Sequence, residues 1–303
     1  MPDPPSPRAL RTTRLGGGFS LVELVVVISI TGVIAAVIGS FISGPIQGFF
    51  DQARRAQLVD AAQLALVRMG RDLRVALPNS VRISGSSIEM LLTLDGDRYR
   101  SEAAPGAGDA NVLRFDVADA GFNTLRPLNS QGVAAGLLRL AVYPLGPLSD
   151  ANPYAAPTLI GGGGETEGVM TPAGVVGLSG TPVTIGGVNE YAVTLTPGHR
   201  FRYESPTRRV FLVGGPVTWR CDTAVRDLLR HDGYSVNAVQ SATPAGGTTA
   251  VVIDDYVSAC RFAYDPGTAQ RSAVVTLAVE LADAAQPLER IRLVRQVHLG
   301  NLP

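Results

Sequence analysis

Residues 19–42 read FSLVELVVVISITGVIAAVIGSFI, and this stretch decides how the rest of the chain is organised. Its 24 residues carry one charged side chain, that of Glu23. A helix of this length would span roughly 36 Å, which is enough to cross the hydrocarbon core of a bilayer. We therefore predict a transmembrane helix over 19–42.

The flanks of this stretch predict its orientation. Residues 1–18 are polar and contain Arg8, Arg11 and Arg14, whereas no basic residue follows the apolar stretch until Arg54. Positive charges near a membrane span remain in the cytoplasm. The sequence thus predicts a cytoplasmic N-terminus and a C-terminal part outside the cytoplasm.

Glu23 is unusual, because a carboxylate inside an apolar span costs at least ~2–3 kcal/mol on insertion scales. Such a charge needs a partner. If the chain were cut between Gly18 and Phe19, the new α-amino group of Phe19 would be a cation at the same depth as Glu23. It would pair with Glu23 of a neighbouring copy and hold stacked helices in register.

The residues Gly18-Phe19-Ser20-Leu21-Val22-Glu23 resemble the prepilin cleavage and methylation motif of type IV pilins and type II secretion pseudopilins. The resemblance implies that a prepilin peptidase removes residues 1–18, that Phe19 is N-methylated, and that Glu23 guides filament assembly. The alternative is an ordinary signal peptide or anchor helix. A signal peptide has an apolar region of only ~7–15 residues, shorter than this one.

Both ends of the chain resemble minor pilin-like proteins of the MSHA pilus biogenesis system, the MshO kind. The stretches that carry this resemblance are 41–83, 209–213, 216–221, 260–270 and 295–301. The resemblance implies a single-pass inner-membrane protein with a periplasmic C-terminal domain, which then enters a pilus or pseudopilus. Its expected partners are the prepilin peptidase and other pilin or pseudopilin subunits. Residues 101–190 add nothing to it.

An extended amphipathic helix is expected over 43–77. Gly44-Pro45 can break or bend the chain, and Pro78-Asn79 ends the helix. An apolar stripe recurs every three or four residues, at Val59, Ala62, Leu66, Met69, Leu73 and Leu77. In pilins, the outer half of the long helix packs on a β-sheet, and this stripe suits that contact. The arginines on the other faces are either solvated or contact neighbouring subunits.

In residues 78–303 the apolar and polar residues tend to alternate with a period of two, which predicts strands. The expected fold class is α+β, with the long helix packed on a mainly antiparallel β-sheet, as in pilins. Asp95-Gly96-Asp97 is a hairpin signal. The Gly/Pro-rich region 144–187 is expected to be a long loop, and 224–233 one short helix. The expected strands are 81–83, 87–94, 98–100, 111–116, 136–143, 191–195, 201–203, 209–213, 217–221, 250–253, 260–264, 273–281 and 291–297.

Cys221 and Cys260 are the only cysteines, and each lies in an expected strand. An exported, oxidising compartment permits a disulfide between them. The bridge would close a loop of about 40 residues, for which chain entropy gives roughly 4 kcal/mol. Two buried free thiols are the alternative.

Other signals point away from catalysis and cofactors. With 26 basic and 26 acidic residues, the net charge is zero, so no nucleic-acid partner is expected. Asp95-Gly96-Asp97 and Asp254-Asp255 are more typical of turns than of calcium sites. The three histidines lie in no motif, and the glycines at 161–164 do not form a phosphate loop. We expect no enzyme, no cofactor and no metal.

Two classes of function remain after these exclusions. The first is a structural subunit, a minor pilin or pseudopilin that primes or caps a type IV, MSHA-like filament. Its closest rival is a type II secretion minor pseudopilin. The second class is a filament-tip adhesin, whose β-domain and 144–187 region bind a surface ligand.

Overall fold

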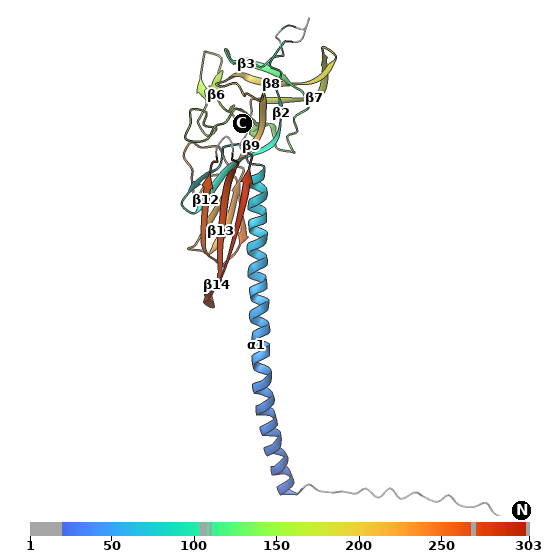
Figure 1. The fold of residues 1–303 in the computed structure, drawn as a ribbon, viewed down its shortest axis with the longest axis vertical. Coiled ribbons are helices and arrows are strands. Elements are labelled where there is room, and N and C mark those ends of the chain that lie inside the picture. The colour runs from blue at the N-terminus through green and yellow to red at the C-terminus, as the bar shows by residue number, and fades with distance from the viewer. Residues whose placement is uncertain (1–19, 104–107, 109–110, 268–270, 301–303) are drawn as a thin grey trace, which may run out of the picture. The chain divides into compact units, whose positions relative to one another are not determined.

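The computed structural model describes residues 20–103, 108, 111–267 and 271–300. Residues 1–56 and 57–303 form two compact units, and one helix, α1 (Leu21–Arg74), contributes to both. The β-strands all belong to the second unit (Figure 1). The expected α+β class is therefore confirmed.

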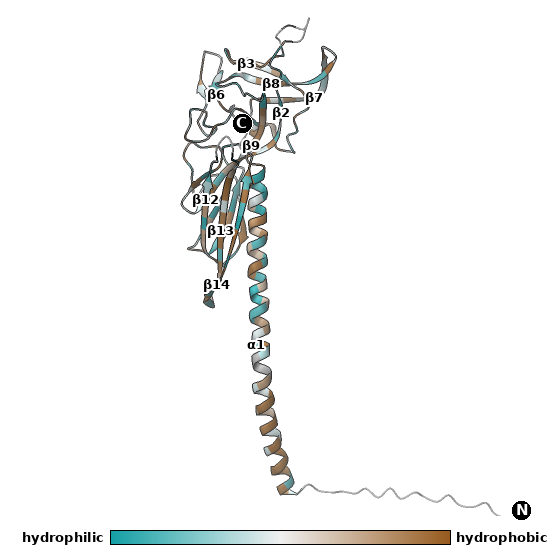
Figure 2. Cartoon of the chain, in the orientation of Figure 1, coloured by the Kyte–Doolittle hydropathy of each residue, from teal (hydrophilic) through white to brown (hydrophobic). Residues whose placement is uncertain are grey.

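The first unit is described over the N-terminal part of α1. Ser20 caps the helix, because its side-chain Oγ accepts a hydrogen bond from the Glu23 backbone N–H at 3.2 Å. Large apolar side chains from Leu21 to Phe41 are exposed. Figure 2 colours most of this part of the α1 ribbon brown, for hydrophobic residues. Within the described part of the chain, α1 is long and apolar enough to cross a membrane.

The structure decides one alternative for this helix and corrects its expected end. Of the break or bend expected at Gly44-Pro45, a break is excluded, since α1 continues through Pro45. It ends at Arg74, three residues before the expected Leu77. The Leu77 N–H donates to the Leu91 carbonyl at 2.7 Å, and the Thr93 N–H donates to the Val75 carbonyl at 2.8 Å. Pairing with the first long strand therefore ends the helix before Pro78.

The second unit begins with the C-terminal part of α1, which packs against two antiparallel sheets. The six-stranded sheet has the order β1-β2-β9-β10-β11, with β4 beside β9, and the three-stranded sheet has the order β12-β13-β14. Their bounds are β1 Arg82–Ser84, β2 Ser87–Arg98, β4 Arg139–Val142, β9 Arg209–Asp222, β10 Asp227–Asp232, β11 Thr248–Ile253, β12 Val257–Asp265, β13 Ala273–Asp283 and β14 Gln286–Leu299. The expected packing of the apolar stripe on a sheet is confirmed.

The core between helix and sheets contains the stripe residues Ala62, Leu66, Met69 and Leu73 together with Trp219. Val59 is an exception, because it is only partly buried. β14 lies close to α1 at Gly70, where a Cβ atom would lie 3.2 Å from Arg295 Nε and 3.5 Å from Val297 Cγ2. Glycine at this position lets β14 lie against the helix, and Figure 1 shows the two side by side.

A further five-stranded sheet covers a second core. Its order is β3-β8-β6-β5, with β7 beside β8, and only the β6–β8 pair is parallel. The bounds are β3 Asp119–Thr124, β5 Thr158–Leu159, β6 Thr166–Gly168, β7 Val176–Ile185 and β8 Val188–Phe201, with a 3₁₀ turn over Ala135–Leu137. The second core includes Tyr99, Phe122, Phe201 and Leu212.

Four local predictions in the second unit are wrong. Asp95-Gly96-Asp97 is not a turn, because β2 runs through it and pairs with β9 after a register shift. Residues 111–116 form no strand. The 144–187 region contains β5, β6 and all of β7, so it is not one loop. Residues 224–233 are a turn followed by β10, which folds back on β9 and buries Leu228.

Candidate functional site

The cleavage residues Gly18 and Phe19 lie outside the described residues, so cleavage and methylation stay predictions. Glu23 is described, and its side chain is exposed. The Ser20–Glu23 contact is half of a capping box, a pattern in which a Ser or Thr precedes a Glu by three residues. Sequence reasoning missed Ser20 although this spacing was a usable signal.

Cys221 and Cys260 form the expected disulfide, with their Cα atoms 6.1 Å apart. Cys221 is buried in β9 of the six-stranded sheet, whereas Cys260 is half-buried in β12 of the three-stranded sheet. The bridge thus connects the two sheets that share the main core.

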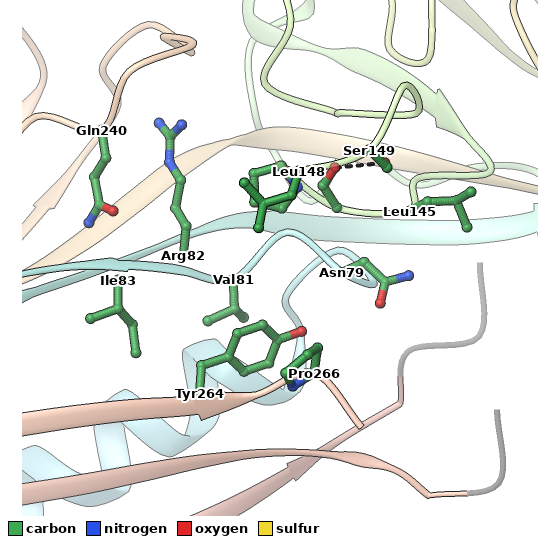
Figure 3. Close-up of a pocket in the computed structure, with 12 residues that line it drawn as sticks. Asn79, Val81, Arg82, Ile83, Leu145, Leu148, Ser149, Gln240, Tyr264 and Pro266 are labelled. Carbon is green, nitrogen blue, oxygen red and sulfur yellow. Dashed lines mark hydrogen bonds between the residues drawn. The ribbon is translucent and has the colours of Figure 1, made fainter. Parts of the chain in front are cut away.

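The second unit contains a groove of about 670 Å³ between the edge strand β1, the end of β12 and the 145–149 turn (Figure 3). Val81 and Ile83 lie on one side, Leu145 and Leu148 on another, and the ring of Tyr264 lies near Pro266. Leu148 is fully exposed at the rim, with a relative exposure of 103%. Most of the lining is therefore apolar, which is typical of ligand sites.

The charged residue in this groove, Arg82, is already neutralised. Its Nε donates to Glu89 Oε2 at 2.7 Å, and its terminal nitrogens donate to the Asn237 and Ala238 carbonyls at 2.8 and 2.7 Å. The guanidinium carbon also lies 3.6 Å from the centroid of the Tyr154 ring. Arg82 therefore anchors the 237–238 segment and leaves the groove without an unpaired cation.

The network beneath Arg82 is buried. Tyr234 donates to Glu89 Oε1 at 3.0 Å, and Tyr154 donates to the Ser80 carbonyl at 2.7 Å. Burial, with the nearby Glu89 charge, raises the pKa of both tyrosines, so their hydroxyls remain protonated donors. The network connects Arg82 to Tyr234 through Glu89, and the Tyr154 ring beneath Arg82 to the Ser80 carbonyl.

The chemistry that this groove supports is binding of an uncharged, largely apolar group. The side-chain amides of Gln240 and Asn79 donate to the Ser87 and Pro144 carbonyls. No group of three or more His, Cys, Asp or Glu side chains with metal-binding geometry occurs in the described part of the chain. Sequence reasoning missed the groove because its residues come from four distant segments.

No family model, curated protein or solved structure matches this chain.

Proposed function

We propose that this protein is a minor pilin or pseudopilin that primes or caps a type IV, MSHA-like filament. The observation that carries the proposal is Gly18-Phe19 followed by Glu23 at the head of an apolar helix. α1 supports it, because one uninterrupted helix combines an exposed apolar part with a part packed on β-sheets. The prepilin peptidase would leave 303 − 18 = 285 residues with a methylated Phe19.

Glu23 has two candidate roles, and variants of Glu23 and of its hydrogen-bond partner Ser20 distinguish them. In the assembly role, its carboxylate pairs with the Phe19 amine of a neighbouring subunit. In the capping role, it only helps to start α1, where an acidic side chain in the first turn stabilises by about 0.3–1 kcal/mol. In the low dielectric of a membrane, the attraction between the Glu23 carboxylate and the Phe19 amine is largely offset by the cost of removing both charges from water. Replacing Glu23 should therefore affect filament assembly more than it affects the stability of a single chain.

Glu23→Val tests the proposal, and Ser20→Ala is the matched control. Glu23→Val keeps the backbone N–H that Ser20 caps, whereas Ser20→Ala removes the cap and keeps the carboxylate. We expect both variants to be cut to 285 residues by intact-mass measurement, and only Glu23→Val to lower filament number severalfold at equal membrane level. Uncut wild-type protein, or normal filaments with Glu23→Val in a strain without redundant minor subunits, would overturn the proposal.

The type II secretion alternative differs in where the filament acts. Deletion of the gene should remove surface fibres if the protein primes an MSHA-like pilus. Intact fibres together with lost secretion of an exported enzyme would instead favour the minor pseudopilin.

The groove beside β1 favours a second candidate, a filament-tip adhesin. A concave, largely apolar site on an exported β-domain is suited to a ligand. Leu148→Asp should then weaken attachment to a surface while filament number stays normal. Leu159→Asp, at an exposed leucine on β5 outside the groove, is the control. Equal attachment by both variants would contradict the adhesin.

A further inference from the structure

One end of the second unit presents an exposed leucine. The β13–β14 turn, over residues 283–286, is followed by Leu288, whose side chain is 96% exposed. Two other turns are bonded to this end. The Ala282 N–H donates to the Tyr256 carbonyl, and the Val257 N–H donates to the Arg226 carbonyl, each at 2.8 Å. We call the surface formed by the 283–286 turn, Leu288 and the two turns hydrogen-bonded to it, at Arg226 and at 254–256, the knob end.

The knob end carries two ion pairs and, beside them, unpaired charges of both signs, because the exposed Arg292 lies opposite Glu280 on β14 and has no partner among the described residues. Arg226 is paired with Asp255 at 2.9 Å, and Arg290 with Glu280 at 3.1 Å. Asp254, beside Asp255 in the same turn, is exposed and has no partner among the described residues. The knob end thus combines an apolar side chain with a free carboxylate and a free guanidinium.

The other end of the second unit contains a cleft of about 470 Å³ at the end of α1. Its apolar lining includes Val75, Leu94 and Phe211, and its rim carries Arg74 and Arg209. Both arginines are exposed, and within the described residues neither guanidinium has a hydrogen-bond or ion-pair partner, although the Arg209 backbone N–H donates to Ser205 Oγ at 3.2 Å. The lining also includes Asp95, whose carboxylate accepts from the Gly96 and Asn129 backbone N–H groups. The cleft thus offers apolar side chains beside two exposed cations and one hydrogen-bonded carboxylate.

The direction of β14 shows that the knob end and the cleft lie at opposite ends of this strand. Arg295 lies against Gly70, and Gly300 lines the cleft together with Arg74, so β14 runs in the same direction as α1. The 13 residues from Leu288 to Gly300 extend over roughly 40 Å. A chain therefore cannot insert its own Leu288 into its own cleft.

We propose that the cleft binds the knob end of a second copy of this chain, with Leu288 between Val75 and Phe211 and Asp254 near Arg74 and Arg209. Two different surfaces meet in this contact, so it is heterologous and repeats in one direction. The Asp254 carboxylate is complementary in charge to Arg74 and Arg209, and Arg292 to Asp95 of the cleft, which favours this orientation over contact between like ends. The proposal rests on the filament-forming role and adds which surfaces meet.

Cysteine cross-linking of the full chain in membranes tests this contact. Leu288→Cys and Val75→Cys variants, expressed together, should form a disulfide-linked dimer, and neither variant should do so alone. The double variant should form a ladder of oligomers. Leu159→Cys expressed with Val75→Cys is the control and should remain monomeric. The native Cys221–Cys260 bridge leaves no other free thiol in the described chain.

A charge exchange provides an independent measurement. Arg74→Asp should lower the cross-linked fraction about tenfold, and a partner copy carrying Asp254→Arg should restore it. Cross-linking of Leu288→Cys to itself, to a different subunit, or not at all in cells with normal filaments would overturn the proposal while leaving the filament role intact. Cross-linking in cells whose fibres do not depend on the gene would support the contact and contradict the filament role.

Discussion

His199 is fully buried in β8, and both of its ring nitrogens have partners. Nε2 donates to the Gly168 carbonyl at 3.3 Å, so in the neutral ring Nδ1 accepts from the Thr166 hydroxyl at 2.7 Å. Burial is the main reason that the pKa of His199 falls to about 4, although Gly168 and Glu167 act in the opposite direction. His199, which lies in no sequence motif, thus has the most strongly shifted pKa of the described histidines.

This histidine predicts a pH dependence of stability. An unfolded histidine has a pKa of about 6.5, so between pH 6.5 and 4 the unfolded chain binds a proton that the folded chain does not. Stability should therefore fall as the pH drops through this window, by up to about 3 kcal/mol below pH 4. Urea unfolding at several pH values, compared between wild type and His199→Gln, measures the effect. An equal slope in the two proteins would contradict it.

At the scale of elements, Asp72 attaches α1 to the six-stranded sheet. Its Oδ2 accepts from Trp219 Nε1 at 2.9 Å and from Arg230 Nε at 2.8 Å. Trp219 is fully buried in the main core, so its N–H has no solvent to replace this acceptor. Apolar packing of the helix stripe is non-directional, and these bonds define how the helix lies on the strands.

Replacing this carboxylate should weaken the second unit. Asp72→Ala leaves a buried indole N–H without an acceptor and removes one partner of Arg230, at a cost of about 3 kcal/mol. Asp60→Ala, at an exposed aspartate on the same helix, should change stability by less than about 0.5 kcal/mol. Chemical unfolding of both variants in detergent checks this prediction. Equal losses would show that Asp72 has no special role.

At the scale of the whole molecule, the Cys221–Cys260 bridge restrains the two sheets of the main core. It connects residues 39 positions apart, so breaking it frees a long loop in the unfolded chain. Cys221→Ala with Cys260→Ala should lower the unfolding free energy by about 4 kcal/mol. Wild-type protein in reductant should match the double variant, and reductant should not affect that variant further. A double variant as stable as the oxidised wild type would refute this role.

Several features could be predicted from the sequence because their cause is local. The apolar run around Val25 and the three-to-four spacing of Leu66, Met69 and Leu73 specify helix and buried face without knowledge of any partner. Strands with clear alternation, such as β13, were also predictable. The disulfide followed from two cysteines in strand-like sequence and an oxidising compartment.

Only the tertiary structure decided which segments pair, because pairing partners lie far apart in the chain. Asp95-Gly96-Asp97 has the sequence of a turn, yet β9 supplies hydrogen-bond partners on its flank and holds it in a strand. Residues 227–232 have helix-compatible composition, but burial of Leu228 against the core favours a strand. The groove beside β1 and the cleft at Arg74 each combine distant segments. The chain alone specifies local periodicity, whereas long-range contacts decide between local alternatives of similar free energy.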